Sequence, residues 1–285
     1  MKVKFEEKTY ESYFNNELDQ KSSIYFPPGQ VLEGALGFDA SSFTRNRRLW
    51  RMLGYPCWFF PPFHGVDLQD VAHELNSVLG HIVDGVPKVK ANLFIQYKRP
   101  EYITARSGKE WSYWNEAYFR YKVDRDQQKI LFKIDQKFGS QALVVYASPA
   151  ISTLDELVIC KKKSKIIEST NFKKARDLNN HNRNTYIQSG VHSIACSEPQ
   201  KIENLNLLSE LERLDSISGS EMKQVIINTS NIITEEILEN SKLGVVFKEL
   251  MAEYRELENY KMLYAHLILK CFREISGIQW LVACA

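Results

Sequence analysis

The sequence predicts an α/β domain over residues 1–200, followed by a helical C-terminal region over residues 201–285. Two apolar segments that read as strands, residues 92–98 and 142–146, flank residues 124–138, which have helical spacing. Strand, helix and strand in this order imply a right-handed crossover and a parallel strand pair. In the C-terminal region the apolar residues instead recur at steps of three and four, which is typical of helices.

The chain before residue 90 is expected to hold a short helix and a basic, aromatic stretch. Pro27-Pro28-Gly29 breaks any helix, and residues 30–36 can then form about two helical turns before Gly37. Arginines alternate with tryptophans and phenylalanines in residues 45–62, and such a mixture can grip a nucleic acid. The alternative is that these rings are core and the arginines are solvated.

The central elements are the best defined. Asp124 is a good N-cap for the helix over residues 124–138, and Gly139 ends it. The continuous apolar run over residues 142–146 fits a strand buried on both faces. The aromatic-rich residues 111–123 are expected to extend or cover the sheet. Three lysines share one face of the helix: Lys129, Lys133 and Lys137.

Beyond residue 150 the pattern weakens. Ser152 and Asp155 have the spacing of a capping box, which predicts a short helix ending near Cys160. The lysine-rich residues 161–165 read as a solvated loop, and the polar residues 169–199 as mostly irregular structure.

The C-terminal region contains an apolar seam over residues 243–271, as expected for a long amphipathic helix. If this helix covered the core as a simple appendage, much of the seam would face solvent, which soluble proteins usually avoid. We therefore expect it to join a homo-oligomer or a partner subunit. Burial against residues 205–240 is the alternative. The side chains of interest are Phe247, Leu250, Tyr254 and Leu257.

Composition restricts the class of protein. The 285 residues are 44% hydrophobic, enough for a sizeable core, and no segment reaches 18 consecutive apolar residues. The chain start lacks an apolar leader, so we expect a soluble, cytoplasmic protein without a membrane partner. The 37 basic and 35 acidic residues give a formal charge of +2, so a nucleic-acid surface would have to be a local patch. The five scattered cysteines include no Cys-x-x-Cys pair, which favours reduced thiols.

The segment Gln96-Tyr97-Lys98 ends the first strand. Alternate strand residues share a face, so Gln96 and Lys98 are expected to project together. Asp39, in Gly37-Phe38-Asp39-Ala40, is a candidate for an acid supplied by another segment. A carboxylate and an amide oxygen suit Mg²⁺, and a lysine can neutralise charge on a phosphate under attack.

This order of elements resembles the PD-(D/E)XK superfamily of restriction-endonuclease-like nucleases, in particular its Gln-x-Lys variant found in Mrr-type enzymes. The resemblance covers about residues 14–150. It implies a mixed sheet flanked by helices and Mg²⁺-dependent phosphodiester cleavage, with Mn²⁺ as an alternative ion. It makes Asp39 a metal ligand, places Gln96 where many members have a glutamate, makes Lys98 the catalytic lysine, and adds Glu33 as a helix acid.

Other assignments compete. Asp67 and Asp84 are nearer to Gln96 in sequence than Asp39 is, and each is an alternative metal acid. No His-Glu-x-x-His, Gly-x-Ser-x-Gly, Walker-type or dinucleotide-binding motif is present. Cys196 lies near His192, but a buried, unreactive thiol is the commoner situation.

The sequence thus predicts a metal-dependent DNA endonuclease, and the resemblance implies a role in prokaryotic restriction or defence against phage. It does not distinguish DNA from RNA. The residues expected to contact the nucleic acid are Arg99, Lys129, Lys133 and Lys137. The competing hypothesis is an interaction module without catalysis that acts through its C-terminal helices.

Overall fold

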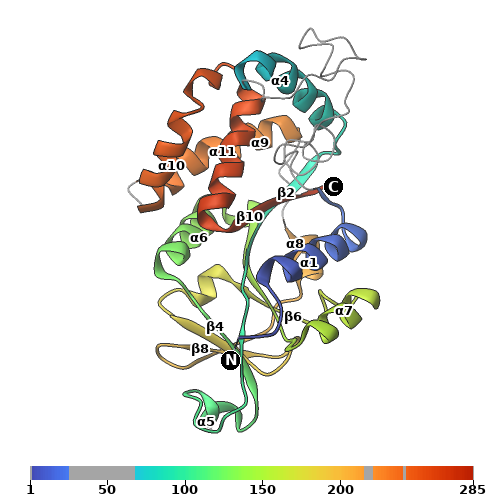
Figure 1. The fold of residues 1–285 in the computed structure, drawn as a ribbon, viewed down its shortest axis with the longest axis vertical. Coiled ribbons are helices and arrows are strands. Elements are labelled where there is room, and N and C mark those ends of the chain that lie inside the picture. The colour runs from blue at the N-terminus through green and yellow to red at the C-terminus, as the bar shows by residue number, and fades with distance from the viewer. Residues whose placement is uncertain (1, 26–67, 215–220, 240–241, 285) are drawn as a thin grey trace, which may run out of the picture.

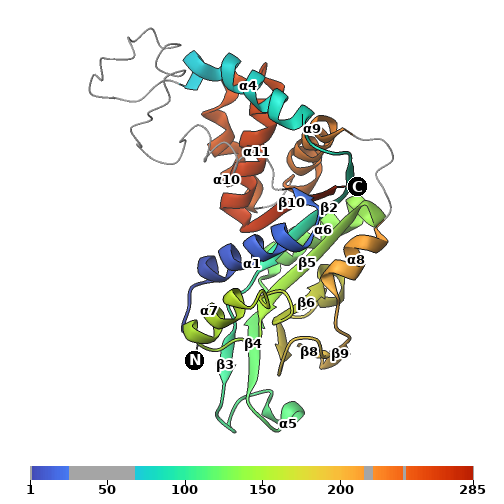
Figure 2. The ribbon, with the colours of Figure 1, turned by 90° about the vertical axis from the view of Figure 1, so that its right-hand side faces the viewer.

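The computed structural model describes residues 2–25, 68–214, 221–239 and 242–284. Its architecture is mixed α/β, with two five-stranded sheets (Figures 1 and 2), so the predicted α/β class is confirmed. In spatial order the first sheet consists of β1 (Ile24–Tyr25), β10 (Ile278–Cys284), β2 (Val89–Tyr97), β5 (Ala142–Pro149) and β6 (Thr170–Lys174). The second consists of β3 (Glu101–Ile103), β4 (Tyr118–Lys122), β7 (Arg183–Tyr186), β8 (Ser193–Cys196) and β9 (Gln200–Ile202).

Some helices pack on the faces of the first sheet, and others form a separate group at one end of the molecule. Figure 1 shows that group, with α4, α9, α10 and α11, at the end opposite to α5. No helix within the described residues is long and apolar enough to cross a membrane. The α-helices of the described residues are α1 (Glu7–Lys21), α4 (Leu68–Asp84), α5 (Trp111–Trp114), α6 (Arg125–Phe138), α7 (Leu154–Lys162), α8 (Leu207–Arg213), α9 (Met222–Ile232), α10 (Lys242–Ala252) and α11 (Lys261–Ser276).

The predicted strand, helix and strand are confirmed. β2 and β5 pair in parallel, α6 leads directly into β5, and every residue of β5 is buried. The connection between the two strands also contains β3, α5 and β4 of the second sheet. The side chain of Asp124 caps α6 by accepting the backbone N–H groups of Asp126 and Gln127, each at 3.0 Å. Gly139 ends the helix with a φ of +53°, a conformation that favours glycine.

The two faces of the first sheet are covered by different helices. Tyr97 of β2 contacts Phe14 of α1, with ring centroids 5.5 Å apart. Phe94 contacts Phe138 of α6 on the opposite face, at 5.3 Å. Because side chains alternate along a strand, Gln96 shares the α6 face with Phe94.

Residues 169–199 were predicted to be mostly irregular, and this is wrong, since β6, β7 and β8 run through them. Their polar side chains are buried and bond to one another instead of showing an apolar alternation. Ser193 Oγ donates to Asn171 Oδ1 at 3.1 Å, and Asn184 Nδ2 donates to the same oxygen at 3.4 Å. Buried polar residues that bond to each other in this way leave no hydrophobic period in the sequence.

The predicted capping box is displaced by one residue. Thr153 caps α7 by accepting the N–H of Glu156 at 3.2 Å, and the Glu156 carboxylate accepts the Thr153 N–H at 3.2 Å. Ser152 contributes its own N–H and hydroxyl to the same carboxylate. Several hydroxyl groups next to one another made the position of the cap ambiguous.

The C-terminal region differs from the prediction in two ways. The seam is divided between α10, the short turn Arg255–Leu257 and α11, and Phe247 and Leu257 are only 2% and 3% exposed. Helix α11 packs against α4, α9 and α10, and the turn packs against α4, all within the same chain. The apolar patch from which self-association was inferred is therefore absent at these positions. The region is also not purely helical. Gly277, at a φ of +69°, ends α11 and leads into β10, which lies between β1 and β2, so residues 201–285 share a sheet with residues 1–200.

The burial of Lys173 in β6 predicts a pH dependence of stability that can be measured. Its side chain is almost fully buried, and Nζ donates to the carbonyl oxygen of Glu203 at 2.8 Å. Burial lowers the pKa of Lys173 from 10.5 to about 8, and the negative charges of Asp177 and Glu203 oppose this shift. Between pH 8 and 10.5 the unfolded chain keeps the proton that the folded chain has lost.

The free energy of unfolding should therefore rise with pH across this window, by about 3 kcal/mol at most. We expect the difference between wild type and Lys173→Met, measured by urea unfolding at several pH values, to change by that amount. A difference that is constant from pH 7 to 10 would contradict the lowered pKa.

Candidate active site

Gln96 and Lys98 lie at the carboxyl end of β2, on the side of the sheet covered by α6. Lys98 Nζ donates a hydrogen bond of 2.6 Å to Gln127 Oε1 in the first turn of α6, and it lies 5.7 Å from the ring centre of Tyr146. Gln127 Nε2 in turn donates to the carbonyl oxygen of Ser276 at 2.6 Å. Gln127 therefore links the end of α11 to Lys98 and holds the ammonium group in place.

Gln96 is buried, with 3% exposure. Its Nε2 donates to the carbonyl oxygen of Tyr97 at 3.0 Å, but its Oε1 has no hydrogen-bond partner among the described residues. A buried acceptor left unsatisfied costs on the order of 1–3 kcal/mol. A donor or a cation that reached this oxygen would remove the cost.

Two carboxylates act on Lys98 without a direct ion pair among the described residues. Burial lowers the pKa of Lys98, while the charges of Glu7 and Asp124 raise it in part. Burial also raises the pKa of Glu7, whose carboxylate accepts the backbone N–H of Arg99 at 2.9 Å. The sequence did not identify Glu7 as part of this site, because only the packing of α1 brings its first residue to the end of β2.

Among the described residues, none of the acids predicted from the sequence lies at this site. Asp39, Glu33 and Asp67 lie outside the described residues. Asp84 ends α4, just before the amino end of β2, and roughly 20 Å of strand separates that end from Gln96. Asp84 is therefore ruled out as a partner of Gln96. No group of three or more His, Cys, Asp or Glu residues within the described part of the chain could hold a metal ion.

The predicted nucleic-acid contacts are partly used within the fold. Arg99 pairs with Glu6 at 2.8 Å, and Lys137 pairs with Glu236 at 2.5 Å. Lys133 Nζ approaches two carbonyl oxygens of the segment after α9, at 3.3 and 3.4 Å. Lys129 remains highly exposed, with a loose contact of 3.8 Å to Asp126. The lysine face of α6 is thus in large part an intramolecular contact with the helices near the C-terminus.

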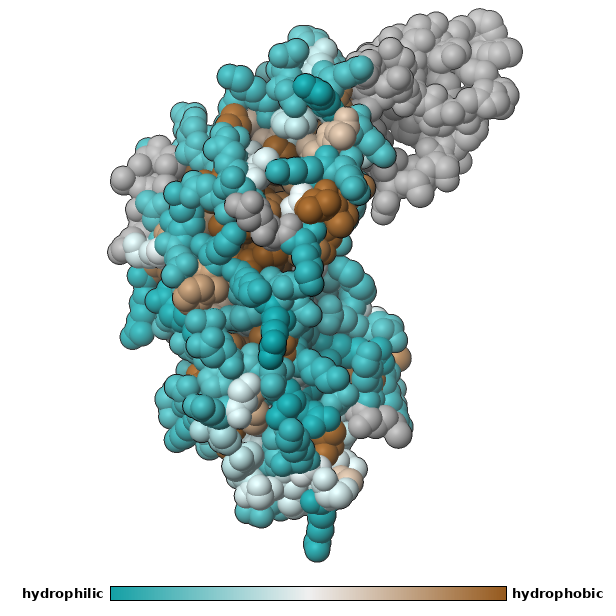
Figure 3. All heavy atoms as spheres, turned by 90° about the vertical axis from the view of Figure 1, so that its left-hand side faces the viewer, coloured by the Kyte–Doolittle hydropathy of each residue, from teal (hydrophilic) through white to brown (hydrophobic). Residues whose placement is uncertain are grey.

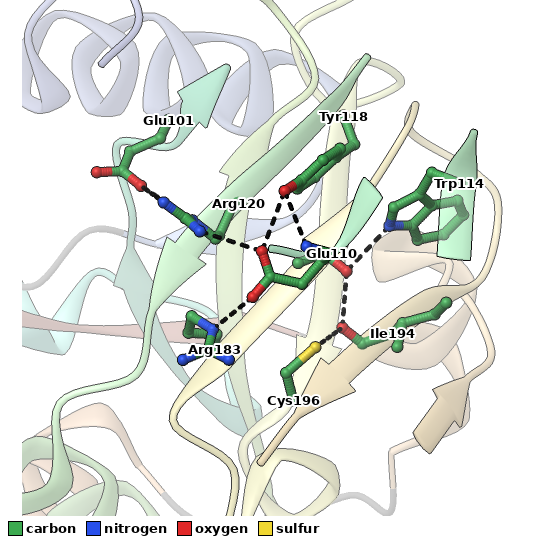
Figure 4. Close-up of polar contacts among 9 residues, drawn as sticks. Glu101, Glu110, Trp114, Tyr118, Arg120, Arg183, Ile194 and Cys196 are labelled. Carbon is green, nitrogen blue, oxygen red and sulfur yellow. Dashed lines mark hydrogen bonds and ion pairs between the residues drawn. The ribbon is translucent and has the colours of Figure 1, made fainter. Parts of the chain in front are cut away.

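A second polar cluster lies in the other sheet, around Glu110 (Figure 4). The carboxylate of Glu110 is 1% exposed and receives hydrogen bonds from Arg183 Nε at 2.8 Å, Arg120 Nη1 at 3.1 Å and the Tyr118 hydroxyl at 3.1 Å. Arg120 also pairs with Glu101 at 2.7 Å. Every charge of this cluster is compensated, so its role is to fix the local structure.

Cys196 lies beside this cluster and donates to the carbonyl oxygen of Ile194 at 3.6 Å. Burial raises the pKa of the Cys196 thiol. The thiolate required of a nucleophile is therefore disfavoured here.

A hollow of about 360 Å³ lies on the other side of the first sheet, between α1 and the end of α11. Glu11, at its wall, forms ion pairs with both Lys8 and Arg273. These two cations are thus already paired and offer less to a phosphate than Lys98 does.

Comparisons of this chain with protein-family models, with curated proteins and with solved structures find no match.

Proposed function

We propose that this protein is a metal-dependent nuclease that hydrolyses DNA phosphodiester bonds at the carboxyl end of β2. The observation that carries the proposal is the pairing of Gln96 and Lys98. One has a buried amide oxygen with no partner among the described residues, and the other a partly buried ammonium held by Gln127. Both stand beside a parallel strand, helix and strand unit, which is the arrangement that the Gln-x-Lys resemblance implies.

The chemistry assigned to the chain itself is electrostatic. Lys98 uses one N–H to bind Gln127, and its remaining N–H groups can donate to a phosphate oxygen. In a partly buried site such a charge acts more strongly than in water. Glu7 and Asp124 favour the charged form of Lys98 and so help to keep it cationic near neutral pH.

The fit to Mg²⁺ is partial. When bound, the ion would supply a positive charge and an activated water to the reaction. Gln96 Oε1 is one oxygen at this site that has no partner among the described residues, but the ion also prefers carboxylates, and the described part of the chain contains no cluster of three or more His, Cys, Asp or Glu residues that could hold it. Under this proposal Asp39 supplies a carboxylate and Glu33 supports it.

One feature of the fold favours the competing function, an interaction module without catalysis. Helix α4 directly precedes β2 in the chain, and β2 lies between β5 and β10, the second of which comes from the other end of the chain. Within the described residues, no strand that comes before β2 in the chain pairs with it except through β10. If Asp39 does not reach Gln96, the core would bind without cleaving.

Cleavage of supercoiled plasmid in the presence of Mg²⁺ tests the proposal. We expect the wild type to nick the plasmid, Asp39→Ala to lose about a hundredfold or more of the rate, and chelation of the ion to stop the reaction. Asp84→Ala is the matched control and should cut at the wild-type rate, because Asp84 lies beyond the far end of β2. Plasmid binding without any nicking would favour the competing function.

The biological setting in restriction or defence against phage remains part of this proposal and rests on the same resemblance. Parallel assays with single-stranded RNA and DNA would decide which nucleic acid is cut. Sedimentation of the intact chain would test for a homo-oligomer.

A further inference from the structure

A projecting loop joins β3 to β4 at one end of the molecule. We name residues 104–117 the α5 loop, after the single helical turn Trp111–Trp114 that it contains. Figures 1 and 2 both place α5 at the end opposite to α4. Because β3 begins directly after Pro100, the chain that passes the candidate active site at Lys98 continues into this loop.

The base of the α5 loop is held firmly. Glu110 is bound by Arg120, Arg183 and Tyr118. Gly108 has no room for a side chain, since a Cβ there would lie 2.7 Å from Ile103 Cγ2. A surface loop fixed in this way loses little conformational entropy when it binds a partner.

The loop exposes aromatic rings. Tyr113 is 45% exposed. Trp114 is partly exposed and stacks on His192, with ring centres 5.3 Å apart, while its Nε1 donates to Thr185 Oγ1 at 3.1 Å. Figure 3 shows atoms of intermediate hydropathy at this end of the molecule, and a patch of higher hydropathy only nearer the helical end. The loop therefore differs from an apolar docking surface.

The loop is also cationic. Arg106 and Lys109 are exposed, and neither forms an ion pair with a described residue. Glu110 is neutralised inside the fold, and Glu116 is the exposed acid of the loop. Rings with open faces next to unpaired cations match the chemistry of unpaired bases joined by phosphates. Duplex DNA hides its base faces and is a poorer match.

We infer that the α5 loop binds single-stranded nucleic acid, with Tyr113 stacking on a base and Arg106 and Lys109 contacting phosphates. The inference rests on the proposed function for the class of ligand. The inference adds that the nucleic-acid strand bound near Lys98 is single-stranded where it runs along β3 and β4. A nucleic acid carrying a single-stranded segment is thus the preferred substrate.

Fluorescence anisotropy with fluorescein-labelled oligodeoxythymidylate, in EDTA to prevent cleavage, tests this inference. Tyr113→Ala should weaken binding about tenfold, the effect expected for loss of one stacked base. Tyr113→Phe keeps the ring and should bind within about twofold of wild type. Removing Arg106 and Lys109 together should reduce the salt dependence, by about 0.7 in the logarithmic slope for each phosphate that is no longer neutralised.

The outcomes separate this inference from the proposed function. If the wild-type protein binds the oligonucleotide through Tyr113 but never cleaves DNA, the nuclease function is contradicted and the binding surface on the α5 loop is supported. If the wild-type protein cleaves DNA and Tyr113→Ala binds the oligonucleotide as tightly as the wild type, only the binding surface is contradicted. A protein that binds duplex as tightly as single strands, or no oligonucleotide at all, would also overturn the inference, and the second result would point to a protein partner for these rings. Oligouridylate in parallel shows whether RNA and DNA are distinguished.

Discussion

Replacing Lys98 with alanine is expected to reduce plasmid cleavage at least about a hundredfold while leaving the protein folded. The ammonium of Lys98 is the partly buried cation at the candidate site, and loss of one preorganised electrostatic group typically costs a factor of about a hundred to a thousand in rate. The substitution leaves the partly buried Gln127 amide oxygen without its donor, so the free energy of unfolding should fall by no more than about 1–3 kcal/mol. Rates measured under single-turnover conditions, with circular dichroism for the fold, would provide the comparison.

The control for Lys98 is Lys201→Ala, which removes an exposed lysine from β9 and should cut normally. The pH profile gives a second measurement. Because burial lowers the pKa of Lys98, cleavage should decline with rising pH before an ordinary lysine would titrate, and Lys98→Arg should extend activity to higher pH if it cuts at all. Wild-type cleavage by Lys98→Ala would place the active site elsewhere.

Replacing Glu110 with alanine is expected to lower the free energy of unfolding by about 3 kcal/mol. The carboxylate is the shared acceptor for Arg120 and Arg183, and its removal leaves two partly buried guanidinium groups short of a partner. Breaking a buried ion pair by removing one member typically costs about 3–5 kcal/mol. We expect the lower end because both arginine side chains are about one-fifth exposed and Arg120 retains Glu101. Urea unfolding would measure the loss.

Glu116→Ala is the matched control for Glu110, since it removes an exposed carboxylate from the same loop and should change stability by less than about 0.5 kcal/mol. Glu110→Gln keeps the shape of the side chain and should fall between the two. An equal, small effect of Glu110→Ala and Glu116→Ala would show that the cluster does not anchor the α5 loop.

Local patterns in the sequence were sufficient where one segment carries the whole signal. Helix α6 was recognisable from its cap Asp124, its stop Gly139 and its apolar period, all within 16 residues. The parallel pairing of β2 and β5 followed from the order of the elements and the handedness of their connection. Capping and periodicity act over a few residues, so they can be recognised in the sequence before the fold is known.

Patterns failed where polar side chains replace apolar ones in the core. β7 and β8 bury Asn184 and Ser193, and these bond to Asn171 of β6. Hydrogen bonds between different strands hold these groups, although Asn171 Nδ2 and Asn184 Oδ1 have no partner among the described residues, and no pattern within a single strand predicts the bonds. For the same reason the sequence did not predict that Glu110 is buried, since its partners Arg120 and Arg183 lie in other segments.

The sequence by itself determined the α/β class, the parallel strand pair and the proximity of Gln96 and Lys98, because all three depend on local periodicity and chain order. Only the tertiary structure decided that Gln127, Glu7 and Asp124 surround Lys98, and that β10 rather than a preceding strand lies beside β2. It also decided that the C-terminal seam packs within the chain, with Phe247 and Leu257 buried and Leu250 and Tyr254 partly buried. These outcomes depend on which distant surfaces pack together, and packing is set by the shape and charge of whole elements, which no short stretch of sequence contains.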